Sequence, residues 1–335
     1  MVVDAALRAA AAAVTDPGAH VPDERLRLMF ACCHPALAPE ARVALTLRFV
    51  AGLPTPEIAH LLLVQETTMA ARLTRAKRRL AASGIPFATP PPERLGERLD
   101  VVATALYLVF TAGYQPADAA APLRSALGDE AIRLVRELDG LLPGRAVVRA
   151  LLALMLLQHS RRDARLAADG TLVLLTGQDR GRWHSDEIAE GLAVLSTIGP
   201  ATGQAQAYRL QALIASEHAV APDAAATRWA VISTLYADLE QLTGSPVVRL
   251  ARAVAVAEAD GPQAALALLD GLESALPRYH RLPAVRGELL ARAGRNAEAA
   301  VQLAAALRLG PNPAERAHLE ARLRTTQGRP PHLGG

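Results

Sequence analysis

The chain is a succession of alanine- and leucine-rich segments that proline and glycine interrupt at short intervals. Alanine and leucine are strong helix formers, whereas Val, Ile and Thr form no alternating runs bounded by turn residues. Proline and glycine end helices. The sequence therefore predicts an all-α protein of many short helices. Its 335 residues predict two or three domains, or one domain followed by a repeat array.

The breaks between helical segments suggest five parts. Three successive prolines, Pro90 to Pro92, mark the clearest linker, because no helix continues through them. We expect a leader or linker remnant over 1–21, a first helical domain over 22–86, a central helical domain over 93–205, helical repeats over 206–326 and a disordered tail over 327–335.

The expected repeats rest on a helix-pair rhythm in the last third of the chain. Gly261 and Gly294 each separate two helical halves, and Ala265 aligns with Ala299. The spacing of about 33–34 residues is typical of tetratricopeptide repeats. Because the usual signature Trp and Tyr are missing, we interpret the array as tetratricopeptide-like.

Composition narrows the function classes. The net charge is only +3, so any nucleic-acid contact must come from a local basic cluster. The two adjacent cysteines, Cys32 and Cys33, offer neither a disulfide framework nor the four ligands of a zinc site, and we expect them to be buried. No apolar run is long enough for a membrane span, and the N-terminus lacks a basic leader. We expect a cytoplasmic protein without membrane contact.

No catalytic motif stands out. A Gly-rich phosphate loop, a nucleophile elbow and a paired-carboxylate motif are all absent, and the histidines are scattered. We therefore expect no enzyme, no catalytic residue, no metal and no cofactor. One loop contains Asp179, Arg180, Arg182 and Trp183. These residues could line a ligand pocket, or they could form a structural ion-paired loop in which the Trp packs on a helix.

Residues 39–82 have the pattern of a helix-turn-helix. Pro39 suits the first turn of one helix, and Thr55 and Pro56 suit the cap and first position of the next. After a break at 64–66, a third helix is expected from Thr67 to Ala82. Its predicted buried stripe is Met69, Leu73, Ala76 and Leu80, and its predicted outer stripe is Ala71, Thr74, Arg75 and Arg78.

Such an outer stripe suits the major groove of DNA. Small residues let a helix approach the base edges, and Arg reads guanine with two hydrogen bonds. The basic end of the helix, Lys77 to Arg79, can pair with phosphates. The alternative is an ordinary helical hairpin with a solvated basic face.

A resemblance to a known family favours the DNA-binding interpretation. The run TPEIAHLLLVQETTMAARLTRAKRRL, Thr55 to Leu80, resembles the −35-binding region of extracytoplasmic-function sigma factors of the sigma-70 family. The matching positions are Glu57-Ile58-Ala59, Val64, Thr68-Met69, Arg72-Leu73, Arg75-Ala76-Lys77 and Leu80. Flanking segments resemble one subgroup that carries a C-terminal tetratricopeptide-like extension: 22–48, LYLVFTAGY at 106–114, LLALMLL at 151–157, QDRGRW at 178–183 and RAVAVA at 252–257.

The resemblance implies promoter −35 recognition, with double-stranded promoter DNA and RNA polymerase core as partners and a regulatory helical extension open to a protein or peptide. It implies these DNA-binding residues: Thr67, Thr68, Ala70, Ala71, Arg72, Thr74, Arg75, Arg78 and Arg79. The alternatives are a helix-turn-helix regulator with a repeat-based sensor and an interaction scaffold without DNA binding. Two departures from the family are expected to matter. Gln65 replaces the usual Ser cap of the recognition helix, and the N-terminal −10-binding domain is expected to be lacking, through truncation, a misplaced start or genuine loss.

Overall fold

The computed structural model describes residues 24–34, 36–50, 52–62, 64–82, 91–95, 98–113, 125–167 and 173–328. Within these ranges every regular element is a helix, apart from an isolated bridge at Leu166. The predicted all-α class is confirmed. The expected leader over 1–21, the first part of the expected linker and the tail after Gly328 lie outside the described residues.

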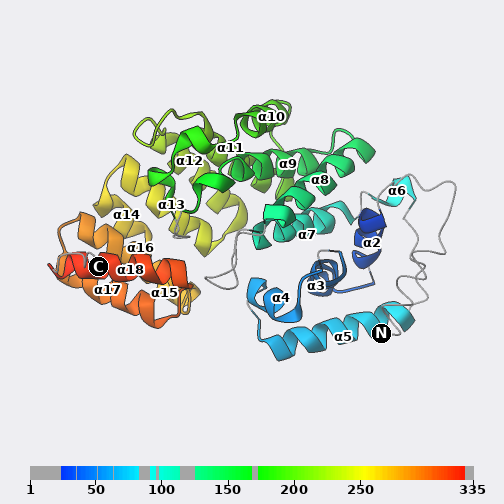
Figure 1. Cartoon of the computed structure of the whole chain (residues 1–335), viewed down its shortest axis with the longest axis horizontal. Helices are drawn as coiled ribbons and strands as arrows, with labels where there is room; N and C mark the ends of the chain where they lie inside the picture. The colour runs from blue at the N-terminus through cyan, green and yellow to red at the C-terminus, as the bar shows by residue number, and fades with distance from the viewer. Residues whose placement is uncertain are drawn as a thin grey trace. The chain divides into compact units, whose positions relative to one another are not determined.

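The chain divides into two compact units, and the boundary falls between Met155 and Leu156, inside α9. Most breaks between helices fall where proline or glycine was expected to end them. The described helices of the first unit, with α9 continuing into the second, are α2 (Glu24–Cys32), α3 (Pro39–Phe49), α4 (Thr55–Leu61), α5 (Glu66–Ala82), α6 (Pro92–Leu95), α7 (Leu99–Ala112), α8 (Ser125–Leu141) and α9 (Ala146–His159) (Figure 1).

Helix α7 joins the core that α2 and α3 begin. Val102, Leu106 and Phe110, four residues apart, are fully buried, and α7 packs on both α3 and α8 (Figure 1). Just before α7, Arg98 Nη1 donates a 2.9 Å hydrogen bond to the carbonyl oxygen of Phe30 in α2. Helix α7 follows the prolines at which the sequence suggests a linker, yet it supports the same core as the helices before them.

The second unit is a series of short helices connected by tight turns. Three 3₁₀ turns, η2 (Arg162–Ala164), η3 (Leu175–Gly177) and η4 (Arg180–Arg182), precede the α-helices. These helices are α10 (Ser185–Ser196), α11 (Gly203–Val220), α12 (Trp229–Thr243), α13 (Pro246–Ala259), α14 (Pro262–Leu268), α15 (Leu272–Ala275), α16 (Arg281–Arg292), α17 (Asn296–Arg308) and α18 (Pro313–Thr326).

Consecutive helices pack as pairs from α11 onward. Helices α12 and α13 pack together, as do α13 and α14, α16 and α17, and α17 and α18. Gly294, which turns α16 into α17, has a φ of 77°, a left-handed conformation that favours glycine. Gly287 lets the two helices approach closely, because a Cβ there would lie 2.8 Å from Leu303 Cγ.

Ion pairs repeat along this array at one separation in the sequence. Arg292 and Glu258 lie 34 residues apart and pair at 2.6 Å. Arg322 and Glu288, again 34 residues apart, pair at 2.7 Å. The same separation joins Arg281 to Glu315. These three ion pairs of the described residues therefore share one sequence separation.

The loop around Trp183 is a structural element. Trp183 is buried, and the Arg180 guanidinium lies 4.7 Å from the centre of its ring. Arg180 also donates to the carbonyl oxygens of His218 and Ala221, at the end of α11. The packed Trp agrees with the structural interpretation, but carbonyl groups, rather than the carboxylates of an ion-paired loop, hold the arginine.

Candidate nucleic-acid interface

Helices α3, α4 and α5 form a compact trihelical unit, because α3 packs on α4 and α5, and α4 packs on α5 (Figure 1). Between α4 and α5 the chain turns tightly, and the Val64 amide donates to the Ala59 carbonyl at 3.0 Å. The Met69 amide donates to the Gln65 carbonyl, so Gln65 immediately precedes the first turn of α5. The predicted order of two short helices, a turn and a longer helix is confirmed.

Two predicted helix starts were one residue late. Helix α5 begins at Glu66 rather than Thr67. Helix α4 already includes Thr55, and the Ile58 amide donates to the carbonyl of Pro54, so the expected cap position moves to Pro54. Pro54 has no side-chain acceptor for a cap. Shifts of one residue are common, because local capping geometry decides where a helix begins and ends.

The inner face of α5 holds the helix against α3 and α4. Met69, Leu73, Ala76 and Leu80 are buried, as the helical spacing predicted. Ile58 of α4 is fully buried beside this stripe. Close-packed interiors tolerate little rearrangement, so the direction of the opposite face of α5 is fixed by this packing.

Polar groups brace the same unit. Arg48 Nη1 donates to the Leu53 carbonyl at 3.0 Å, which ties the end of α3 to the turn before α4. Lys77 Nζ lies 4.7 Å from the centre of the Phe49 ring, a cation–π contact between α5 and α3. The sequence grouped Lys77 with the phosphate-pairing residues, and the structure gives it a packing contact as well.

The outer face of α5 presents the nine residues that the resemblance singled out. Eight are exposed: Thr67, Thr68, Ala70, Ala71, Thr74, Arg75, Arg78 and Arg79. The ninth, Arg72, is half-buried at the edge of the inner stripe. The structure thus brings all nine together on one helix.

Two of these side chains also bond to their own helix. The Thr74 hydroxyl donates to the Ala70 carbonyl at 2.9 Å, and the side chain remains exposed. Arg75 Nε donates to the Ala71 carbonyl at 3.3 Å, a long contact that a better acceptor can replace. The remaining four N–H donors of the Arg75 guanidinium are available to a ligand.

The charge of α5 is strongly one-sided. Glu66 is its only acidic residue, against five basic ones. Among the described residues, no carboxylate lies within ion-pairing distance of Arg75, Arg78 or Arg79. An α-helix with its side chains is about 10–12 Å across, and the major groove is about 12 Å wide. Helix α5 can therefore fit into a major groove, and its unpaired guanidinium groups lie on its exposed face.

One exposed residue beside the expected DNA-contacting set was not singled out from the sequence as a candidate contact. Gln65 is exposed and stands directly before the first turn of α5, next to Thr67 and Thr68. The first residues of a recognition helix commonly contact base edges, and the amide of Gln reads adenine. The signal was in the sequence, where Gln65 was noted only as a departure from a Ser cap.

The cysteine pair lies in the interior, as predicted. Cys32 and Cys33 are buried, and the Cys33 thiol lies 3.8 Å from the Thr46 hydroxyl. Burial raises the pKa of Cys33 to about 11 and that of Cys32 further still. Both thiols therefore stay protonated and unreactive while this part of the molecule is closed.

The described residues contain neither a membrane-spanning helix nor a cluster of metal-binding side chains. No helix in the described ranges is long and apolar enough to cross a bilayer. In those same ranges, no three His, Cys, Asp or Glu side chains gather in a way that could hold a metal ion.

In comparisons with known proteins, two stretches of the chain match protein families, and most of the chain matches one relative. Residues 27–80 match the family described as sigma-70, region 4. Residues 98–198 match a family of unknown function, DUF6596. An uncharacterized protein of Rhizobium meliloti (strain 1021) is 44% identical over 312 residues, which is 91% of this chain and 72% of that protein. No solved structure matches the chain at a significant level.

Proposed function

The chain belongs to the same family as the Rhizobium meliloti protein and carries a sigma-70 region 4 domain, and from this premise we propose that it recognises promoter −35 elements as part of an RNA polymerase sigma factor. One observation carries the proposal. Within the matched region, the exposed face of α5 combines small side chains with Arg75, Arg78 and Arg79, and its inner face is anchored in a packed core.

The proposed contact places α5 in the major groove. Ala70, Ala71 and Thr74 are small enough to let the backbone approach the bases. Arg75 then reads a guanine through two hydrogen bonds, and Arg79, at the end of the helix, pairs with a phosphate. Thr67 and Thr68 lie at the end of α5 that enters the groove first.

The finer assignments belong to the same proposal. We assign the chain to the extracytoplasmic-function class and interpret α11–α18 as a tetratricopeptide-like regulatory extension, which the recurring 34-residue ion pairs support. RNA polymerase core is the proposed protein partner, and the cytoplasm the proposed compartment, because promoter DNA and polymerase are there. The proposed role is recognition rather than catalysis, and it needs no cofactor.

The test uses the full chain and random-sequence duplexes, because the promoter is not specified by the sequence. Repeated selection should enrich one short motif, and a pull-down with the same protein should retain RNA polymerase core. Arg75→Ala combined with Arg78→Ala should prevent enrichment. Arg308→Ala is the matched control, because Arg308 is exposed on α17 and carries the same charge.

The outcomes separate three functions. Enrichment together with polymerase capture supports the sigma-factor proposal. Enrichment of a motif without polymerase capture would instead identify a helix-turn-helix regulator. Absence of salt-dependent DNA binding would contradict both and favour a protein-interaction scaffold.

A further inference from the structure

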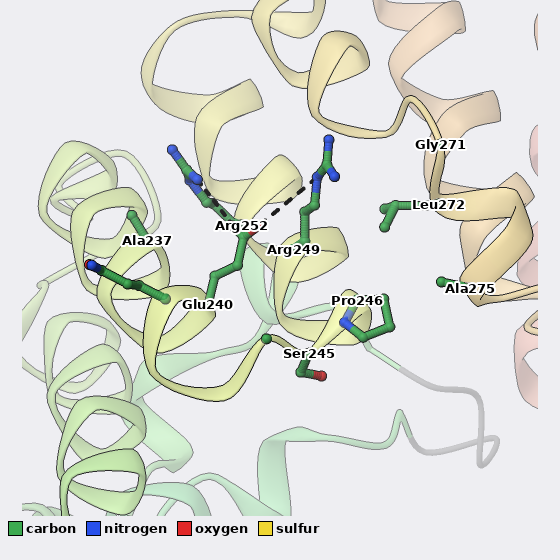
Figure 2. Close-up of a pocket in the computed structure, with 11 residues that line it drawn as sticks. Ala237, Glu240, Ser245, Pro246, Arg249, Arg252, Gly271, Leu272 and Ala275 are labelled. Carbon is green, nitrogen blue, oxygen red and sulfur yellow. Dashed lines mark hydrogen bonds and ion pairs between the residues drawn. The ribbon is translucent and has the colours of Figure 1, made fainter. Parts of the chain in front are cut away.

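The second unit contains a groove between α12, α13 and the short helix α15. Its volume is about 640 Å³, within the 300–1,000 Å³ range that is usual for ligand sites. The turn between α12 and α13 forms its floor. Lining residues are Ala237, Glu240, Gln241, Gly244, Ser245, Pro246, Arg249, Arg252, Gly271, Leu272 and Ala275 (Figure 2).

One carboxylate and two guanidinium groups dominate the charge of this groove. Figure 2 shows the Glu240 carboxylate between Arg249 and Arg252. Arg252 Nη1 donates to Glu240 Oε2 at 3.0 Å. Arg249 Nε lies 4.0 Å from Glu240 Oε1, too far for a hydrogen bond. Because Glu240 offsets only one of the two arginines, the cluster keeps one positive charge in excess.

Both arginines have guanidinium N–H donors that can bind a ligand. The one hydrogen bond found for Arg249, from Nη2 to the Asp270 carbonyl, is long at 3.3 Å. Arg252 Nε is shielded from water and has no hydrogen-bond partner among the described residues. A guanidinium group carries five N–H donors, and its fork matches the two oxygens of a carboxylate. The groove therefore has the chemistry to bind a ligand carboxylate at Arg249.

The opposite side of the groove is apolar. Leu272 and Ala275 face Arg249 and Pro246 across the open space (Figure 2). A ligand that contacts both sides of the groove must carry a carboxylate for the arginine side and an apolar group for the side of Leu272 and Ala275.

We propose that this groove binds a short acidic peptide segment of a partner protein, with a carboxylate on Arg249 and an apolar side chain against Leu272. Charge complementarity selects an acidic ligand, and the apolar side at Leu272 and Ala275 selects a peptide with apolar side chains over a compact anion. Glu240 acts as an internal competitor, because it occupies Arg252 and repels an incoming carboxylate. This site is separate from α5, and the proposal does not rest on DNA binding.

The test titrates the full chain with a fluorescein-labelled peptide of alternating Glu and Leu; a peptide with Gln in place of Glu is the neutral control. Arg249→Ala should weaken binding of the acidic peptide about tenfold or more, through loss of a charge-assisted pair. Glu240→Gln keeps the shape and an acceptor for Arg252, and it should tighten binding about threefold at low salt. Arg308→Ala should bind like the unchanged protein, because Arg308 does not line the groove.

A gain of affinity cannot come from misfolding, so Glu240→Gln decides the result even if Arg249→Ala disturbs the fold. Equal affinity of Glu240→Gln and the unchanged protein, or equal binding of acidic and neutral peptides, would overturn the proposal. Displacement of the peptide by an equal concentration of free glutamate or inorganic phosphate would overturn the peptide assignment and identify a small-anion site. Selection of DNA by the same samples reports on α5 independently.

Discussion

Removal of the Arg98 side chain should loosen the attachment of α7 to α2. Arg98 is only 8% exposed, and its hydrogen bond to the Phe30 carbonyl joins positions 68 residues apart. A hydrogen bond from a charged donor contributes about 1.5–3 kcal/mol. Arg98→Ala leaves the buried carbonyl without this donor, and the local opening free energy should fall by about that amount. Arg98→Lys keeps the positive charge but loses the planar guanidinium group, so an intermediate fall in the opening free energy is expected.

The cysteine pair gives a direct assay of this opening. Cys32 and Cys33 are the only cysteines of the chain and follow Phe30 at the end of α2. Because both are buried with raised pKa values, a thiol reagent reacts only when this region opens. When reclosing is fast, the labelling rate follows the open population. A loss of 1.5–3 kcal/mol corresponds to labelling about 10- to 150-fold faster.

Arg308→Ala is the control for charge, since it removes an exposed arginine of the second unit and should leave the rate unchanged. If Arg98→Ala labels within about twofold of the unchanged protein, the bond contributes less than about 0.5 kcal/mol. The hydrogen bond to Phe30 would then contribute little to the attachment of α7, and the reasoning about Arg98 would be refuted.

Two further predictions concern the second unit. Burial and two nearby guanidinium groups lower the pKa of His218 from 6.5 to about 4. Between these values the unfolded chain binds more protons than the folded one, so stability should fall by up to about 3 kcal/mol as pH drops from about 6.5 to 4. Urea unfolding followed by tryptophan fluorescence at about pH 7 and about pH 4.5 measures this loss of stability. The loss should be much smaller in His218→Gln. An equal loss in that variant would show that groups other than His218 cause it. Gly287→Ala should destabilise by about 1–3 kcal/mol through the clash with Leu303. Thermal unfolding measures the effect of this substitution. In the same experiment Gly140→Ala, at a position where a Cβ has open space, should leave the stability unchanged or raise it slightly.

The sequence was most informative where structure is local. The period of 3.6 residues separated the buried and exposed faces of α5 correctly, and proline and glycine marked the ends of most helices. The expected offset of about 33–34 residues rests on small residues that recur in two helix pairs, Gly261 with Gly294 and Ala265 with Ala299. The proposed interface could be predicted to this extent because a recognition helix is defined by its own two faces.

Long-range packing was not predictable in the same way. An apolar stripe on α7 shows that this helix is buried, but nothing in the stripe says that its partner is α3. The contact of Lys77 with the Phe49 ring was not predicted, because Phe49 is 28 positions away in the chain. Likewise, Glu240 of α12 meets Arg249 and Arg252 of α13 only when the two helices fold against each other.

The most direct test of the account is a binding titration of Arg75→Ala and Arg79→Ala against a selected duplex and a scrambled one at two salt concentrations. Arg75→Ala should cost about 1–3 kcal/mol on the selected duplex and blur discrimination at one base pair. Arg79→Ala should weaken both duplexes alike and reduce the salt dependence by about one counterion. Equal loss on both duplexes for Arg75→Ala would show that Arg75 reads no base. Unchanged binding in both variants would contradict the central claim that α5 contacts DNA.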